Sequence, residues 1–421
     1  MNQKIAIVGS GISGLVCGHL LHKHQDITLY EANDYVGGHT HTVDVQVNGQ
    51  SYAIDTGFIV FNDWTYPLFL QLMDKLCVPR QPTEMSFSVK NLEENLEYNG
   101  NTINSLFAQR RNLLRPRFYL LIRDILRFNR LCKARLSESD GLSHQTLGSF
   151  LTLNGFSDFF CRNYILSMCA AIWSASLDDA KAFPLKFFLQ FFNNHGLLNI
   201  QHRPQWYTLI GGSRAYIAPM TAGFTDKILL NSPVLAIDKG PAGYQVRAKN
   251  QPDRQFDQVI LACHSDQALR MLSAPSKAQR DILGAIRYAN NEVVLHTDTS
   301  LLPKRPLARA SWNYLLKGQP GERSLPASVT YNMNTLQRIQ SDTTFCVTLN
   351  NSADIDPDSI LQRFDYAHPQ FDEKSLLAQQ RRHEICAQDG LHFCGAYWYN
   401  GFHEDGVRSA LDVCRRFGAG L

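Results

Sequence analysis

The stretch Lys4-Ile-Ala-Ile-Val8-Gly9-Ser10-Gly11-Ile12-Ser13-Gly14 opens the chain, and a second apolar run at residues 26–30 ends at Glu31. The first apolar run predicts a buried parallel strand, and the pattern after the glycines predicts a helix to about His24. Glu31 follows Gly11 by 20 residues. Strand, glycine motif, helix and acid in this order are typical of a dinucleotide-binding βαβ unit.

Each residue type in this motif has a physical role. Gly9 permits a tight turn, and Gly11 lets the backbone approach a pyrophosphate closely. Gly14 and Gly18 let the helix pack on the strands, and its N-terminus attracts phosphate. Glu31 can accept hydrogen bonds from a ribose hydroxyl. The sequence therefore predicts a nucleotide site here.

The run Tyr35-Val-Gly37-Gly38-His39-Thr40 follows the acid and bears on which dinucleotide binds. A second glycine pair allows a further close approach of the backbone, which a longer dinucleotide needs for its ribityl chain and isoalloxazine. This pair favours FAD over NAD.

Five sequence runs follow one another along the whole chain. They are residues 5–39, Asp55-Thr56-Gly57, Gly211-Gly212-Ser213, Asp257-Gln-Val-Ile-Leu-Ala262, and Gly395-Ala-Tyr through Glu404-Asp405-Gly406. With them the chain resembles the flavin-containing amine oxidoreductase superfamily, which includes the phytoene desaturases. It also resembles a bacterial branch of predicted NAD/FAD-binding oxidoreductases, through Ala170-Ala-Ile-Trp-Ser174, Asn194-His-Gly-Leu-Leu198 and Gly401-Phe-His-Glu-Asp-Gly406.

The resemblance implies a noncovalent FAD, with Val234 at its adenine end. The implied cofactor-binding residues are Gly9, Ser10, Gly11, Ile12, Ser13, Gly14, Glu31, Ala32, Gly37, Gly38, His39, Thr40, Asp55, Thr56, Gly57, Gly211, Gly212, Ser213, Val234, Gly395, Glu404, Asp405 and Gly406. The superfamily usually has Arg after the double glycine, where it holds the pyrophosphate. His39 stands there in this chain, which predicts a weaker, pH-dependent phosphate contact.

The resemblance also implies an α/β fold of the amine oxidase type. A discontinuous Rossmann-like FAD-binding domain is expected at residues 1–70, 205–265 and 385–421, with an inserted α+β substrate domain at 71–204 and 266–384. Strand-like runs around Val234, at residues 258–262 and at 391–395 agree with this division. A helical pattern at residues 406–417, with Asp405 at its N-terminus, completes the first domain.

Aromatic residues are dense between residues 150 and 207: Phe156, Phe159, Phe160, Trp173, Phe187, Phe188, Phe191, Phe192 and Trp206. The four at 187–192 share one helical face, which fits either plain core or the wall of an apolar substrate site.

The chain has 421 residues and a formal charge of +3, but residues 110–135 hold nine Arg or Lys against one acid, a local charge of +8. This concentration favours a local basic patch over general nucleic-acid binding. Within it, Arg123, Arg127 and Arg130 fall on one helical face and Phe118, Leu121, Ile122 and Ile125 on the other. The pattern fits peripheral contact with a membrane, at the inner face, or a helix with a solvated basic side.

The remaining features bear on compartment and metal. No apolar run is long enough to span a bilayer, no secretory signal is visible, and the 10 cysteines contain no Cys-x-x-Cys pair. A cytoplasmic protein with reduced thiols is expected. The pairs His22/His24 and His39/His41 lack a further ligand nearby, so no metal site is predicted.

A second Gly-x-Gly-x-x-Gly is absent from the sequence, as is a redox dithiol, so neither an NAD(P)H domain nor a disulfide reductase is predicted. Dehydrogenation of a substrate C–H bond remains, with electrons passing to oxygen, a quinone or another carrier. The catalytic residues are unknown, and the candidates are Trp206, Trp398, Tyr399 and His403.

Two substrate classes compete, a lipid and a small amine. The aromatic segment, the basic patch and the lack of an identifiable acid for an ammonium favour the lipid. Relatives in the resembled branch are commonly encoded near cyclopropane-fatty-acid-synthase-like enzymes, which implies an unsaturated or modified fatty acyl chain. A flavin-dependent isomerase and a redox-silent, FAD-stabilised binding module stay open as alternatives.

Overall fold

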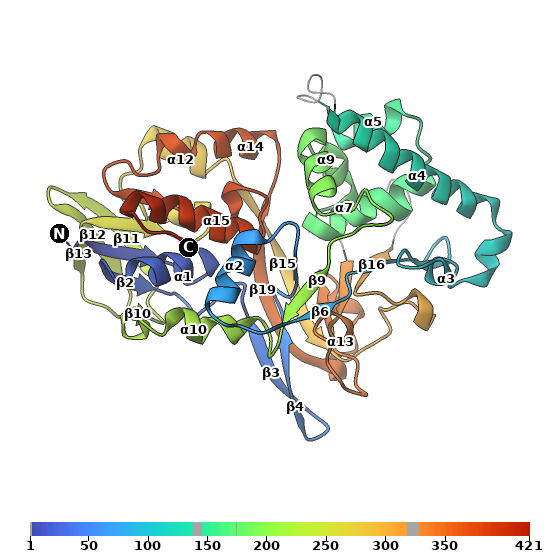
Figure 1. Ribbon diagram of the computed structural model, residues 1–421, viewed down its shortest axis with the longest axis horizontal. Coiled ribbons are helices and arrows are strands. Elements are labelled where there is room, and N and C mark those ends of the chain that lie inside the picture. Colours follow the sequence, from blue (N-terminus) through green and yellow to red (C-terminus); the bar gives the residue numbers. More distant parts are fainter. Residues whose placement is uncertain (1, 138–144, 174, 318–327) are drawn as a thin grey trace.

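The computed structural model describes residues 2–137, 145–173, 175–317 and 328–421, and Figure 1 shows them arranged in two parts. Ser174, the last residue of one motif above, lies outside the described residues. The first part contains both chain ends, and the second carries a group of helices at the opposite end of the molecule.

A five-stranded parallel sheet forms the centre of the first part. Its strand order is β10 (Ile228–Leu229), β2 (Asp26–Tyr30), β1 (Lys4–Val8), β14 (Gln258–Leu261) and β20 (Leu391–Phe393). The strands expected at 258–262 and 391–395 are thus confirmed. Strand order proceeds from β1 to β2 on one side and to β14 on the other, which places a ligand crevice at the carboxyl ends of these strands.

Two helices pack together beside this sheet, α1 (Ile12–Leu21) and α15 (His403–Cys414). The expectation that the first helix reaches His24 is wrong, since α1 ends three residues earlier. The last helix begins at His403 and not at residue 406. Asp405 therefore lies inside its first turn, where it accepts a hydrogen bond from the backbone of Phe402 at 2.9 Å.

The first part also contains an antiparallel sheet. Its strands are β11 (Val234–Gly240), β12 (Gly243–Ala248) and β13 (Arg254–Phe256). Helices α11 (Ser265–Met271) and α12 (Lys277–Leu283) were placed by the sequence in the substrate domain. Their buried residues Ala268 and Ile282 belong to the same apolar core as β1. The domain limits stay a prediction, and this packing favours a later boundary than residue 265.

A seven-stranded sheet underlies the second part. Its order is β19 (Ile360–Gln370), β15 (Arg287–His296), β18 (Cys346–Leu349), β17 (Ser328–Asn332), β16 (Trp312–Leu316), β7 (Phe87–Asn91) and β8 (Leu96–Asn99). All pairs are antiparallel except β16 with β7. The longest strands, β15 and β19, reach back to the first part (Figure 1).

Helices cover the far end of the second part. They are α3 (Ile103–Leu106), α4 (Pro116–Ser137), α5 (Leu147–Leu153), α6 (Asp158–Phe160), α7 (Leu166–Trp173), α8 (Leu177–Ala182) and α9 (Leu185–Asn194). Their apolar faces meet in a second core, rich in phenylalanine, that also includes Val89 and Tyr98 of the large sheet.

Several shorter elements complete the two parts. They are β3 (Thr42–Val47) with β4 (Gln50–Asp55), the sheet β5 (Phe61–Asn62), β9 (Trp206–Leu209) and β6 (Arg80–Thr83), and the helices α2 (Pro67–Lys75), α10 (Ile217–Thr221), α13 (Met333–Leu336) and α14 (Glu373–Gln380). No helix in the described ranges is both long and apolar enough to cross a membrane.

Candidate functional site

One cavity of about 1010 Å³ runs from the carboxyl ends of β1 and β2 into the second part. Its first half is lined by predicted residues: Gly9, Ser10, Gly11, Ile12, Ser13, Glu31, Ala32, Gly37, Gly38, His39, Gly57, Val234 and Gly395. The parallel sheet thus places the motif at the crevice that its strand order predicts.

The first glycines shape the wall in different ways. A Cβ on Gly14 would lie 1.9 Å from the carbonyl oxygen of Gly9, so helix α1 can approach the turn only without a side chain. A Cβ on Gly11 would meet no protein atom within 4 Å. Gly38 packs beside Gly11, with 3.1 Å between its ideal Cβ and the Gly11 Cα. Gly11 therefore leaves a bare backbone facing open cavity.

Glu31 is buried and held rigidly at the same wall. Its Oε2 accepts from the backbone N–H of Ser10 at 2.8 Å and from the Ser10 hydroxyl at 2.6 Å, and its Oε1 accepts from the N–H of Asn33 at 2.9 Å. A carboxylate offers about four acceptor positions. The acceptor position that remains on Oε1 can accept a hydrogen bond from a ribose hydroxyl.

A second set of predicted residues does not line the cavity but braces it: Gly14, Thr40, Asp55, Thr56, Gly211, Gly212, Ser213, Glu404, Asp405 and Gly406. Asp55, at the end of β4, accepts from the N–H of Ser213 at 2.8 Å and from the hydroxyl of Thr42 at 2.6 Å. A Cβ on Gly212 would lie 2.6 Å from Thr42. Burial raises the pKa of Asp55 to about 6, which its hydrogen bonds oppose.

The first turn of α15 ties three elements together. Glu404 accepts from the backbone N–H groups of Leu68 at 3.0 Å and Phe69 at 2.8 Å, and Ser13 donates to the carbonyl of Gly406 at 2.9 Å. Burial raises the pKa of Asp405 to about 7. The Glu404 carboxylate therefore holds α2 to α15, and the Ser13 hydroxyl holds α1 to the same helix turn.

His39 lies on the cavity wall among further aromatic side chains. Its ring centroid is 6.0 Å from that of His264 and 5.5 Å from that of His368, and its buried Nε2 has no hydrogen-bond partner. Burial is the main cause that holds the pKa of His39 well below its usual range, and the two neighbouring histidines contribute in the same direction. Among the described residues no three His, Cys, Asp or Glu side chains form a metal-holding group.

The sequence did not predict His264, Tyr288, Tyr366 or His368, all of which line the cavity. One signal was available. Phe364, Tyr366 and His368 alternate along β19, and this period places them on one face of the strand, against His39 and His41.

The catalytic candidates separate into two pairs. Trp206 and His403 line the cavity, whereas Trp398 and Tyr399 do not. Trp398 is buried under the guanidinium of Arg382, and the Tyr399 hydroxyl donates to Asp412 at 2.5 Å. Trp206 and His403 therefore stay catalytic candidates, whereas the structure removes Trp398 and Tyr399 from the cavity wall. Burial lowers the pKa of His403 to about 3.

The half of the cavity in the second part has an apolar, aromatic wall. It is lined by Phe87, Tyr98, Tyr164, Met168, Ile172, Trp173, Phe191, Trp206, Trp312, Tyr331, Phe371 and Phe402. Of the predicted phenylalanine stripe on α9, only Phe191 lines it, and Phe187, Phe188 and Phe192 are buried core. The stripe is therefore mostly packing.

A family model for flavin containing amine oxidoreductases matches residues 12–349. The chain belongs to this family. As a family member it is a flavin-dependent oxidoreductase, and its cofactor is FAD. No curated protein sequence matches the chain significantly.

Solved structures share the complete fold of this flavin-containing amine oxidoreductase. The CLA-producing fatty acid isomerase from P. acnes is similar at 16% identity and a TM-score of 0.69, covering 99% of this chain and 98% of that one. Cyclohexylamine oxidase from Brevibacterium oxydans IH-35A is similar at 14% identity and a TM-score of 0.69, covering 99% and 100%. Putrescine oxidase is similar at 16% identity and a TM-score of 0.68, covering 99% of both chains.

The residues present fit the family's FAD. Gly11 offers the open backbone that a pyrophosphate requires, Glu31 keeps a free acceptor for a ribose, and the orphaned Nε2 of His39 can donate to a phosphate oxygen. Val234, which the resemblance implies at the adenine end of FAD, also lines the cavity.

The histidine in place of the family's arginine predicts a pH-dependent affinity for FAD. An anion near His39 favours its charged form, which burial and His264 and His368 oppose in the free protein. Proton uptake on binding should therefore make FAD bind more tightly as pH falls from 8 to 6. We expect His39→Arg to tighten binding by roughly 10-fold or more and to remove this slope, since an added charge-assisted hydrogen bond contributes about 1.5–3 kcal/mol.

Calorimetric titration of the apoprotein with FAD at several pH values measures both effects. His24→Arg, which adds the same charge at an exposed position, is the control. An unchanged pH slope in His39→Gln would show that His39 does not contact the phosphate.

Proposed function

We propose that the protein dehydrogenates an apolar chain that carries a carboxylate, an unsaturated or modified fatty acyl substrate, with noncovalently bound FAD as oxidant. The observation that carries this proposal is the wall of the second half of the cavity. It is aromatic and aliphatic over most of its surface, and its one guanidinium among the described residues is that of Arg203.

Arg203 lies at the rim, exposed to solvent, in the segment between α9 and β9. Its Nε donates to the carbonyl of Asn199 at 2.8 Å, which fixes the side chain. Burial raises the pKa of Tyr164, and the charge of Arg203 opposes that rise, so the guanidinium lies near this cavity residue. A carboxylate at the rim with its acyl chain inside fits this arrangement.

An amine is the weaker candidate. Among the described residues, the acids on the cavity wall are Glu31, beside Ser10, and Asp365 on β19, and the side chains named above for the aromatic half include no carboxylate. An ammonium group there would lose hydration without gaining a carboxylate partner. The amine oxidases with the same fold support it, and the fatty acid isomerase with that fold supports a non-oxidative alternative.

The chain's own contribution to catalysis is positioning and exclusion of water. Bound FAD supplies the two-electron oxidation, and the aromatic wall holds an alkyl chain against it. His403 stays neutral, with its Nε2 2.9 Å from the Thr40 hydroxyl and its ring stacked on Phe58 at 3.6 Å between centroids. It therefore gives the cavity a polar but uncharged group. Oxygen, a quinone or another carrier must reoxidise the cofactor.

The rim arginine gives the test of the proposed substrate class. Arg203→Gln should raise the substrate concentration for half-maximal flavin reduction by a fatty acid roughly 2- to 5-fold, because an ion pair at an exposed position contributes about 0.2–1 kcal/mol. The limiting reduction rate should change little, since the contact is remote from the reacting carbon. Arg270→Gln, which removes the guanidinium that lines the cavity in α11, is the matched control. Equal effects of both substitutions, or none from Arg203→Gln, would contradict the carboxylate anchor.

A further inference from the structure

Large apolar side chains are exposed on α3, α4 and the turn between them. They are Ile103, Leu113, Leu114, Tyr119, Leu120 and Leu126, with 81% of Ile103 and 88% of Leu114 accessible to solvent. A single exposed leucine is ordinary, but six such residues within one segment of 24 form a patch. Figure 1 shows α3 and α4 at the end of the molecule opposite the parallel sheet.

Basic side chains continue the same surface. Tyr119, Arg123, Leu126, Arg130 and Lys133 are all exposed, and their spacing of three or four residues places them in one stripe along α4. The only acid of this helix, Asp124, is buried and accepts from the Ser157 hydroxyl at 2.8 Å. The stripe therefore alternates apolar and basic side chains and ends in two basic residues.

The structure corrects one member of the predicted basic face. The guanidinium of Arg127 donates to the carbonyl of Asn154 at 2.6 Å and lies 4.8 Å from the ring centroid of Phe156. This side chain holds α4 to its neighbours, whereas Arg123, which pairs with Asp124 at 3.2 Å, keeps 67% of its side chain exposed, and Arg130 is also exposed.

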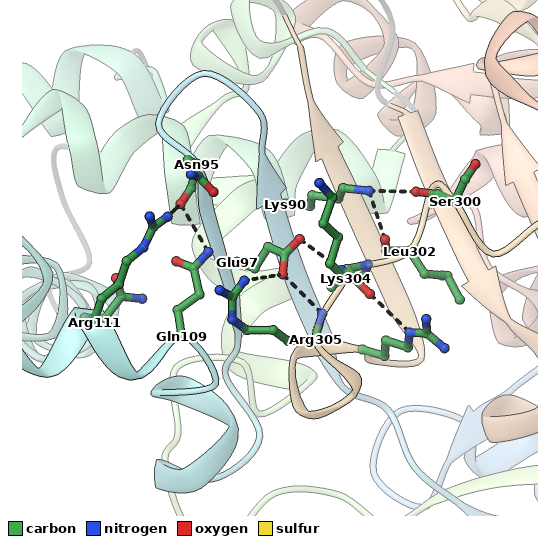
Figure 2. A network of polar contacts seen from close by, with 12 residues as sticks. Lys90, Asn95, Glu97, Gln109, Arg111, Ser300, Leu302, Lys304 and Arg305 are labelled. Atoms are coloured by element: carbon green, nitrogen blue, oxygen red, sulfur yellow. Dashed lines mark hydrogen bonds and ion pairs between the residues drawn. The ribbon is translucent and has the colours of Figure 1, made fainter.

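The exposed apolar residues do not belong to a loose loop, because a polar network fastens the segment to the sheet. Figure 2 shows Gln109 and Arg111 donating to the carbonyl of Asn95. Beside them the buried Glu97 accepts from the backbone of Lys304 at 3.0 Å and from the guanidinium of Arg305 at 3.2 Å. A fixed framework thus presents Leu113 and Leu114 to solvent.

The cavity opens next to this surface. Gly100 and Asn101 line the cavity and are also exposed to solvent, and Ile103 follows them at the start of α3. A molecule that leaves the surface at Ile103 is therefore beside the cavity wall.

We propose that this docking face, formed by the exposed residues of 103–133, binds an anionic lipid bilayer and that the cavity receives its apolar substrate from that bilayer. The combination of apolar and basic side chains indicates a lipid surface as the partner, because leucine and tyrosine side chains enter the interfacial region of a bilayer while arginine and lysine contact lipid phosphates. The transfer of substrate from the bilayer to the cavity rests on the proposed function, whereas the binding of the bilayer does not.

Sedimentation of the FAD-loaded protein with vesicles tests the docking face. Vesicles of phosphatidylcholine with phosphatidylglycerol should bind it at low salt and release it at high salt, and phosphatidylcholine alone should bind it far less. The triple substitution Arg123→Gln, Arg130→Gln, Lys133→Gln should lower the partition coefficient roughly 100-fold, from the contribution of each basic residue near such a surface. Leu113→Ser with Leu114→Ser should lower it without changing the salt dependence.

Lys249→Gln, Arg254→Gln and Lys277→Gln together are the control, since they remove the same charge from exposed positions in the first part. An equal loss of vesicle binding in this control would overturn the proposal. Binding that does not depend on lipid charge, or self-association through the docking face without vesicle binding, would also overturn it. Flavin reduction by detergent-dispersed fatty acid, measured in parallel, reports on the proposed function separately and should be the same in every variant.

Discussion

Gly11→Val should yield a folded but colourless protein that takes up no FAD. The expectation rests on the open space around this residue, where a Cβ would contact no protein atom within 4 Å. The added side chain therefore costs the apoprotein little and occupies the volume that a pyrophosphate requires. The ratio of flavin to protein absorbance, together with the circular dichroism of the variant, measures the effect. We expect a loss of at least 100-fold in FAD affinity, because backbone contacts to both phosphates are lost.

Gly100→Val is a matched control at the other end of the same cavity. A Cβ there also meets nothing within 4 Å, and Gly100 lies among the residues of the aromatic half. This variant should keep its flavin and lose substrate affinity. Retention of FAD by Gly11→Val, or its loss from Gly100→Val, would contradict the orientation of the cofactor that we propose.

The holoprotein should lose stability steeply as pH falls from 6.5 to 5. Burial lowers the pKa to about 4 for His195, His296, His368 and His392, and to about 3 for His403. A histidine whose folded pKa is depressed binds a proton only in the unfolded chain between the two values, so stability falls with pH below about 6.5.

Two carboxyl groups act in the opposite sense. The pKa of Asp55 is raised to about 6 and that of Asp405 to about 7, so each favours the folded state more as pH falls through these values. Near pH 5, the unfolded chain therefore binds about three more protons than the folded chain at these five histidines and two acids. The free energy of unfolding then changes by about 4 kcal/mol per pH unit. Urea denaturation at fixed excess FAD measures this slope.

A single substitution assigns part of the slope. His403→Asn should reduce it by about one proton, or about 1.4 kcal/mol per pH unit, and His24→Asn, at an exposed position, should not. A flat stability profile between pH 6.5 and 5 would show that these histidines are not held neutral by burial.

The sequence predicted the nucleotide-binding part well because its signal is local. Gly9, Gly11 and Gly14 act within one turn, and Glu31 follows on the adjacent strand, so a short motif contains most of the geometry. The helical pattern within residues 110–135 was predicted from periodicity for the same reason. Its buried face, with Phe118 and Leu121, is as expected.

The rest of the site depends on contacts that sequence spacing does not encode. His39, His264 and His368 meet only because β14 and β19 bring distant segments to one wall. Arg127 has the same spacing as Arg123 and Arg130, yet the position of Asn154 turns it inward. Trp398 ends the short helical turn Ala396–Trp398, whose first two residues line the cavity, but its own ring packs under Arg382 and does not line it.

Anaerobic mixing of the holoprotein with one equivalent of an unsaturated fatty acid tests the central claim most directly. We expect the oxidised flavin to bleach stoichiometrically and the recovered acid to have lost one hydride and one proton, which its mass reveals. A small amine should leave the flavin oxidised. A fatty acid product of unchanged mass, formed only after prior reduction of the flavin, would indicate an isomerase. Bleaching by the amine and not by the fatty acid would contradict the proposed substrate class, and no response to either would contradict the proposed reaction.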